Sequence, residues 1–313
     1  MKRKLLFIFC LITLNAIAQN FSGRVVYELT VIPKAKNLNT DSIIQLNRGK
    51  ISEYLITDNY YKSTSFQNDK ELYSYTYDNI SKRMYDNYAD KGYITYRDSR
   101  KANFEYYGSE IFRDSTITVN GLECFMVKYD SDYGKSTTYY SDKIRVNYET
   151  FRDHQVGNWY NKLKEVDGCI SLKTITEFET HYEIREAIEI TPLNLKPSDF
   201  DLNTKKIIVA SPYALDKMVE MEPLDQHQIK LYRKLVQKGV EKLPPEENYT
   251  SYITFIVFKD GHIDYTDTLH KSENGLDQLG IDIFKQCNFR FEPGVINGVK
   301  VSSLVYLPIK FGQ

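Results

Sequence analysis

The stretch that decides the fold is Phe289-Arg290-Phe291-Glu292-Pro293-Gly294, followed by Asn297-Gly298 and by the ending Leu307-Pro308-Ile309-Lys310-Phe311. Pro-Gly and Asn-Gly pairs between apolar runs are typical of tight turns. The residues from Val299 to Phe311 then predict a long terminal strand. This strand needs a sheet to join, and the residues before it supply one.

A helix, a hairpin and a second helix precede this stretch. Asp225 and Gln228 have the spacing of a capping pair at the start of the first helix. Asp260-Gly261 joins two apolar runs, residues 251–258 and 263–269, into a hairpin. The second helix carries one apolar face, formed by Leu276, Leu279, Ile283, Phe284 and Cys287. Residues 225–313 therefore predict a small α/β sandwich with the order helix, strand, strand, helix, strand.

The preceding region, residues 19–191, is rich in strand-forming residues. The chain holds 26 Tyr and 16 Phe, and aromatic richness of this kind favours strands. Tyrosines alternate along residues 72–77, as in a half-buried strand. Asn120-Gly121 predicts a tight hairpin. We expect a mostly antiparallel β-domain, either a curved sheet or a half-barrel, and hence an α+β protein.

The aromatic residues of this β-domain have two interpretations. They line a cavity for an apolar ligand, or they cover a pleated surface with the ring buried and the hydroxyl in water. Residues 192–224 hold four prolines around a short apolar run and are predicted to be a linker, whose centre could be an ordered strand.

The first 18 residues are typical of a secretory signal peptide. A basic start, Lys2-Arg3-Lys4, precedes an apolar run that is too short to span a bilayer and a small-residue site at Ala16-Ile17-Ala18. Removing it leaves the chain more acidic than its full-length net charge of −1. We expect an exported, periplasmic protein that binds no nucleic acid.

Three cysteines lie beyond the signal peptide. A disulfide is allowed in an oxidising compartment, and the sequence predicts one between Cys124 and Cys169 because both lie in the β-domain. Cys287 falls on an apolar helix face, which predicts a buried and inert thiol.

No motif indicates catalysis, a cofactor or a metal. The histidines lack a third ligand at metal spacing, and phosphate-binding loops and nucleophile elbows are missing. The grouped polar residues His262, Asp264 and His270 are the only enzymatic candidates, and their even spacing on a hairpin favours a solvated face. We therefore expect a protein that is not an enzyme.

The β-domain resembles the exported GLPGLI family, which is itself similar to LolA-like lipoprotein carriers. The resemblance rests on Asn120-Gly121-Leu122-Glu123-Cys124, on residues 135–140 and on Asp167-Gly168-Cys169. The segment that gives the family its name is replaced here by residues 166–172. The resemblance covers about half of the chain and implies a fold more than a function.

Residues 225–313 resemble the TonB C-terminal domain. The resemblance rests on Lys259-Asp260-Gly261, on the Phe-Glu-Pro-Gly turn and on the chain ending. Phe291 replaces a frequent tryptophan, and Gly280-Ile281 replaces a common alanine, which is expected to loosen helix–sheet packing. The resemblance implies that a partner adds as a strand to an exposed sheet edge. By position, this edge is formed by Val301, Ser302, Ser303, Leu304, Val305, Tyr306 and Leu307.

Three functions follow. The leading hypothesis is an envelope binding protein whose terminal strand captures a partner, such as a segment of an outer-membrane receptor, in envelope transport. Its β-domain would bind a lipid, a peptide or another protein. The first alternative is a periplasmic carrier of a lipid or another apolar ligand, held in the β-domain. The second alternative is an anchored energy transducer of the TonB type, which requires an uncleaved signal peptide.

Overall fold

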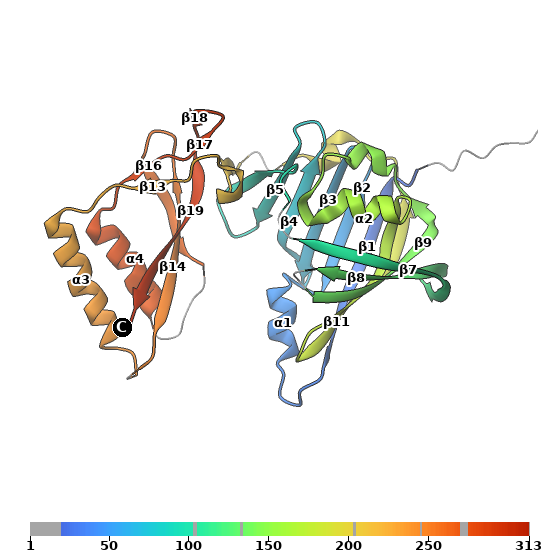
Figure 1. Cartoon of the computed structure of the whole chain (residues 1–313), viewed down its shortest axis with the longest axis horizontal. Coiled ribbons are helices and arrows are strands. Elements are labelled where there is room, and N and C mark those ends of the chain that lie inside the picture. The colour runs from blue at the N-terminus through green and yellow to red at the C-terminus, as the bar shows by residue number, and fades with distance from the viewer. Residues whose placement is uncertain are drawn as a thin grey trace, which may run out of the picture.

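The computed structural model describes residues 20–102, 105–131, 134–202, 205–244, 246–269 and 275–312. The predicted signal peptide lies outside these residues. Within them, fifteen strands form one open sheet. The sheet order is β15-β14-β19-β12-β6-β5-β4-β3-β2-β1-β11-β10-β9-β8-β7. The chain is therefore rich in strands and contains a few helices. This confirms the expected α+β class with a large curved sheet (Figure 1).

The eleven strands described up to residue 192 pair with one another in antiparallel fashion. They are β1 (Gly23–Pro33), β2 (Ile51–Ile56), β3 (Tyr60–Gln67), β4 (Lys70–Asp78), β5 (Arg83–Tyr88), β6 (Tyr93–Asp98), β7 (Tyr106–Val119), β8 (Leu122–Ser131), β9 (Gly134–Arg145), β10 (Cys169–Glu177) and β11 (His181–Pro192). The predicted Asn120-Gly121 hairpin is confirmed, because both residues have positive φ and Val119 pairs with Leu122.

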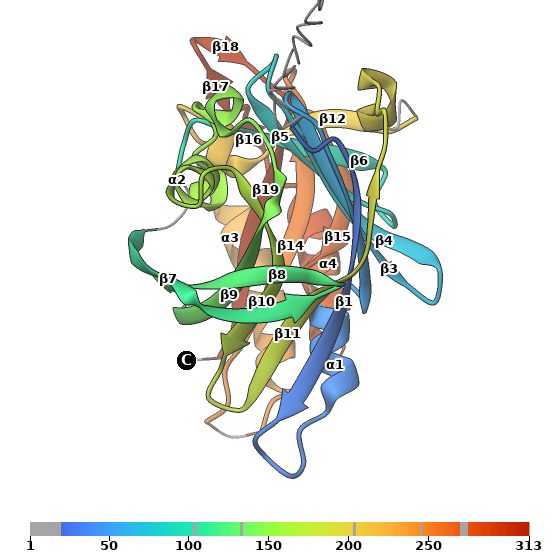
Figure 2. The same ribbon diagram turned by 90° about the vertical axis from the view of Figure 1, so that its right-hand side faces the viewer.

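Two helices flank this part of the sheet: α1 (Thr40–Leu46) near the lower end of β1, and α2 (Trp159–Glu165), which lies across the concave face (Figures 1 and 2). Short 3-10 helices at Tyr148–Phe151 and Val156–Asn158 lead into α2. Phe151 and Leu163 are buried against Tyr61 and Tyr77 of the sheet. The concave face is therefore packed below α2.

The C-terminal unit has the predicted element order. It contains α3 (Gln226–Val240), β14 (Tyr249–Val257), β15 (Ile263–Thr268), α4 (Leu276–Cys287) and β19 (Ser303–Phe311). Asp225 and Gln228 form the predicted capping box. Both helices cover one face of the three strands and bury Phe255, Phe284 and Phe291 between the layers (Figure 1).

The predicted long terminal strand is wrong in one respect. Residues Val299–Lys300 form a separate strand, β18. The chain turns back at Asn297-Gly298, so β18 pairs with the preceding strand β17 (Val295–Ile296). Val301 and Ser302 lie outside any strand, and the amide of Val301 donates to the carbonyl of Gly294. Local pairing across the tight turn therefore replaces continuation of the strand. The remaining short strand pair is β13 (Glu220–Met221) with β16 (Phe291–Glu292).

The expected loosening around Gly280 is also wrong. A Cβ atom at Gly280 would lie 2.8 Å from Ser251 Oγ and 2.9 Å from Ile253 Cδ1. Glycine therefore lets α4 approach β14 closely.

The centre of the predicted linker is an ordered strand that joins both parts of the sheet. β12 (Ile207–Ala210) is parallel to β6 along its length and pairs with the start of β19 through Ala210 and Ser303. The segments beside it contain 3-10 helices at Pro197–Phe200 and Pro212–Ala214. The sheet therefore runs without a break from the β-domain into the C-terminal unit, while the domain boundaries stay a prediction.

Candidate functional site: a cavity on the concave face of the sheet

A cavity of about 400 Å³ opens on the concave face of the β-domain. Strands β1 to β4, β10 and β11 form its floor, and Trp159 at the start of α2 and the turn after α1 contribute to its walls. The lining residues are Tyr27, Leu46, Asn47, Arg48, Ser52, Tyr54, Ser63, Ser65, Tyr73, Tyr75, Trp159, Ile170, Ser171, Lys173, Thr174 and Arg185.

The strand registers explain why space is left here. Tyr54 pairs with Ser63, and Ser63 pairs with Tyr75 on the next strand. Because side chains alternate between the two faces of a strand, these residues all point to the concave face. Serines thus lie between tyrosines across three strands, and the small side chains leave a hollow between the rings. The alternating tyrosines predicted in residues 72–77 are confirmed as Tyr73, Tyr75 and Tyr77.

Aromatic rings form one wall of the cavity. The ring of Tyr54 lies 6.2 Å from that of Trp159 in an edge-to-face arrangement, and Tyr61 behind them lies 5.6 Å from Tyr54 and 5.1 Å from Trp159. Such rings supply large apolar contact area and a few polar atoms at their edges. This wall suits the apolar or aromatic body of a small molecule.

Two of these side chains hold buried donors without an acceptor. The Tyr54 hydroxyl and the Trp159 indole Nε1 form no hydrogen bond within the described residues. Burial is the main cause that raises the pKa of Tyr54 well above its ordinary value, so the hydroxyl keeps its proton. Leaving a buried donor unsatisfied costs about 1–3 kcal/mol. By contrast, the Tyr27 hydroxyl donates to the Ser171 carbonyl at 2.8 Å.

The cavity is also electropositive. Arg185 donates through Nη1 to Ser52 Oγ at 3.2 Å, and Arg48 donates through Nη2 to the Tyr88 hydroxyl at 2.7 Å. Among the described residues that line the cavity, none is Asp or Glu. Lys173 adds little, because its ammonium group pairs with Glu186 at 2.7 Å on the neighbouring strand.

Local backbone structure positions Arg48. Helix α1 ends at Leu46, Arg48 has a φ of +65°, and Gly49 has a φ of +119°. The guanidinium lies over the ring of Tyr73, 3.7 Å from its centroid, and 5.1 Å from that of Tyr88. A non-glycine residue with a positive φ is strained, and such residues often lie at functional sites. Arg48 also lines a second cavity of about 340 Å³ together with Tyr93 and Tyr306.

Below the aromatic wall, a histidine is fully buried. The His154 ring stacks on Tyr77 with centroids 4.2 Å apart, and its Nε2 lies 2.5 Å from the Tyr61 hydroxyl. Burial lowers the pKa of His154 to about 3, so the ring is neutral and its Nε2 shares a hydrogen bond with the Tyr61 hydroxyl. His154 supports the wall. Within the described ranges, no group of three or more His, Cys, Asp or Glu side chains could hold a metal ion.

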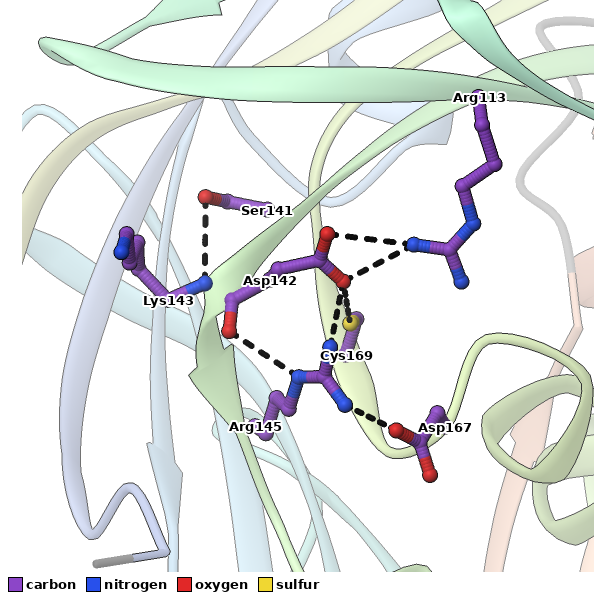
Figure 3. A network of polar contacts seen from close by, with 7 residues as sticks. All are labelled: Arg113, Ser141, Asp142, Lys143, Arg145, Asp167 and Cys169. Carbon is purple, nitrogen blue, oxygen red and sulfur yellow. Dashed lines mark hydrogen bonds and ion pairs between the residues drawn. The ribbon is translucent and has the colours of Figure 1, made fainter. Parts of the chain in front are cut away.

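The predicted disulfide is not formed, and both cysteines are free and buried. Cys124 on β8 and Cys169 on β10 flank β9, so two strand spacings of about 4.8 Å separate their backbones, more than a disulfide spans. Cys169 donates to Asp142 at 3.7 Å instead (Figure 3). Burial raises its pKa to about 12, so the thiol is inert. Cys287 is buried in α4 as predicted.

The polar cluster around Cys169 ties three chain segments together. Asp142 lies between Arg113 and Arg145, and Arg145 also pairs with Asp167 beside Gly168 (Figure 3). Each charged group in the cluster has a partner inside it. We therefore interpret it as structural rather than as a ligand site.

Of the residues predicted to bind a partner, Ser303 to Leu307 lie on β19, whereas Val301 and Ser302 precede it. One edge of β19 pairs with β14 along its whole length, and the other edge pairs with β12 only at Ser303. From Leu304 onward, that second edge has no strand beside it among the described residues. Because backbone groups alternate in direction, the edge would be read at Leu304, Tyr306 and Pro308. Pro308 has no N–H, which limits strand addition there.

Two members of the polar group on the β14–β15 hairpin make local contacts, and the expectation that the group is not catalytic stays a prediction. His262 Nδ1 lies 2.6 Å from Asp260, and its ring stacks on Phe258 with centroids 4.0 Å apart. Asp264 accepts from the amide of Tyr265, and His270 lies outside the described residues.

The sequence interpretation missed the residues that define the cavity: Arg48, Tyr54, Trp159 and Arg185. Their positions depend on registers between distant strands. The serines at positions 52, 63 and 65, which share alternating strand positions with the tyrosines at 54, 73 and 75, are the one sequence signal that could have indicated a hollow face.

No protein-family model matches the chain, and no curated protein matches it. Nothing from family models thus supports the resemblance to the TonB C-terminal domain. Solved structures similar to this chain include PNGF-II in a C2 crystal form, with 10% sequence identity and a TM-score of 0.36. The match covers 75% of this chain and 43% of PNGF-II. The chain thus spans less than half the length of PNGF-II.

Two further similar structures are a LolA-superfamily protein, NE2245 from Nitrosomonas europaea, and a DUF1329-family protein from Desulfovibrio piger. The first has 6% identity and a TM-score of 0.28 over 59% of this chain and 91% of that one. The second has 12% identity and a TM-score of 0.18, and the match covers 57% of this chain and 90% of that protein. These likenesses are too weak to assign the chain to a family. In the described residues, no helix is long and apolar enough to cross a membrane.

Proposed function

We propose that this chain is a non-enzymatic binding protein that holds a small amphipathic molecule in the concave-face cavity. The observation that carries the proposal is a pair of buried donors, Tyr54 OH and Trp159 Nε1, that have no acceptor among the described residues and lie beside a hollow of about 400 Å³. The aromatic wall would take the apolar part of the ligand. Both donor atoms are shielded from solvent, so an acceptor atom on the ligand would satisfy them once the side chains of the wall move to admit it.

The proposal corresponds to a carrier, and the predicted signal peptide supports an action in the periplasm. Strand addition at β19 stays a prediction, and so does an outer-membrane receptor as partner. An anchored transducer depends on retention of residues 1–18, which an intact-mass measurement of the exported chain decides.

Trp159 makes the proposal directly testable, because it is the only tryptophan of the chain. We expect a saturable change in its fluorescence when the full exported chain is titrated with 1-dodecanol or dodecanoate below their aggregation concentrations. Native mass spectrometry should also detect the complexes.

The control is a matched pair of variants on β3. Ser63→Leu fills the cavity from the concave face, whereas Lys62→Leu adds the same side chain on the opposite face. We expect Ser63→Leu to weaken binding by more than about tenfold, or about 1.4 kcal/mol, and Lys62→Leu to leave it unchanged. The proposal is wrong if no probe gives a saturable signal, or if both variants, shown to be folded by circular dichroism, bind like the wild type.

A further inference from the structure

The cavity places two guanidinium groups near one tyrosine. Arg185 on β11 and Arg48 after α1 both line the hollow that contains Tyr75. Burial is the largest cause that raises the pKa of Tyr75, and the charge of Asp86 also raises it, while a hydrogen bond with Ser63 and the charges of Arg185 and Arg48 lower it. Both positive charges therefore act at the same position from different sides of the cavity.

The nearby carboxylates are already engaged elsewhere. Asp86 pairs with Arg97 at 2.9 Å and accepts from the Tyr73 hydroxyl. Glu183 accepts from Asn47 at 2.8 Å, and Glu186 pairs with Lys173. Neither Arg48 nor Arg185 forms an ion pair within the described residues. Among the residues that the structure describes, their positive charges thus have no direct ion-pair partner.

Both guanidinium groups are also held in place. Arg48 is fixed by the two tyrosine rings and by the Tyr88 hydroxyl, and Arg185 by Ser52 Oγ. A planar guanidinium offers paired donors that match an acidic group, and less side-chain freedom is lost when it is already ordered. Half-buried arginines without acidic partners are therefore suited to an anion from solution.

We propose that the cavity selects ligands that carry an acidic group, a carboxylate or a phosphate, bound by Arg185 and Arg48, with the apolar body against Tyr54 and Trp159. This inference rests on the proposed function and adds the chemical class of the ligand. Charge-assisted hydrogen bonds in a partly dry site favour the acid over a neutral molecule of the same length.

The test compares three probes that differ only in their head group: dodecanoate, dodecyl phosphate and 1-dodecanol, followed by Trp159 fluorescence at pH 7.5. We expect at least one acid to bind on the order of tenfold more tightly than the alcohol. The tighter of the two acids identifies the head group. Arg185→Gln and Arg48→Gln should each weaken acid binding by a similar factor and leave dodecanol binding nearly unchanged.

Arg83→Gln is the matched control. Arg83 lies on β5 with its guanidinium over Tyr96, outside the cavity. Retained dodecanol binding shows that each variant is folded. The inference is overturned if the alcohol binds as tightly as both acids, or if Arg83→Gln weakens acid binding as much as Arg185→Gln. Failure of all three probes to bind the wild type would instead contradict the proposed function itself.

Discussion

At the scale of single residues, His154 shows how burial sets a chemical property. Its pKa of about 3 lies below the ordinary value of about 6.5 that it regains on unfolding. Between these two values the unfolded chain binds more protons than the folded one. The free energy of unfolding therefore falls as the pH is lowered from about 6.5 toward 3, by up to about 1.4 kcal/mol per pH unit.

His154→Gln removes this titrating group. We expect the wild type to lose about 2 kcal/mol between pH 6.5 and 5 from this source, and the variant to lose correspondingly less, as measured by urea unfolding. The variant should also be less stable at pH 7.5, because the stack on Tyr77 is lost. The exposed His227→Gln serves as control. Equal pH dependence of His154→Gln and wild type would show that another group causes the acid sensitivity.

At the scale of elements, the close approach of α3 to the terminal strand depends on glycine. A Cβ atom at Gly239 would lie 2.2 and 2.4 Å from ring atoms of the buried Phe311. Alanine favours a helix by about 1 kcal/mol over glycine, but overpacking costs about 1–3 kcal/mol. We expect Gly239→Ala to destabilise the chain in thermal unfolding, while Gln237→Ala on the exposed face of α3 does not. A stabilised Gly239→Ala variant would contradict the close packing.

Element boundaries were predictable where local chemistry decides them. The Asp225 capping box and the Asn120-Gly121 turn require only neighbouring residues, and both formed as expected. The break at Val301 was not predictable, because it depends on the β17–β18 hairpin competing with the longer strand. Trp159 likewise carries no periodic signal, and only the fold brings it to Tyr54.

The edge of β19 also belongs to this scale. If a partner strand adds there, it must pair with the N–H groups of Leu304 and Tyr306, because Pro308 offers none. Tyr306→Pro should then abolish capture of the partner in a crosslinking pull-down, while Tyr306→Phe keeps it. Equal capture by both variants would show that the partner binds elsewhere.

At the scale of the whole molecule, the continuous sheet predicts that the two units unfold together. Ile256 and Leu304 of the C-terminal unit pack against Tyr93 of the β-domain and Val209 of β12. Lys91 forms an ion pair with Asp267 across the same junction. We expect the urea transitions followed by Trp159 fluorescence, which reports on the β-domain, and by far-ultraviolet circular dichroism, which reports on both units, to coincide.

Ile256→Ala tests this coupling. Ile256 is fully buried, and its truncation should cost about 2–5 kcal/mol and weaken the contact between the units. We expect the two transitions to separate, with the C-terminal unit unfolding at the lower urea concentration. Tyr252→Ala on the same strand removes a side chain that is 42% exposed and should leave the transitions together. If the wild-type transitions already differ, β12 joins the strands without coupling their stability, and ligand binding near Trp159 would then protect only the β-domain.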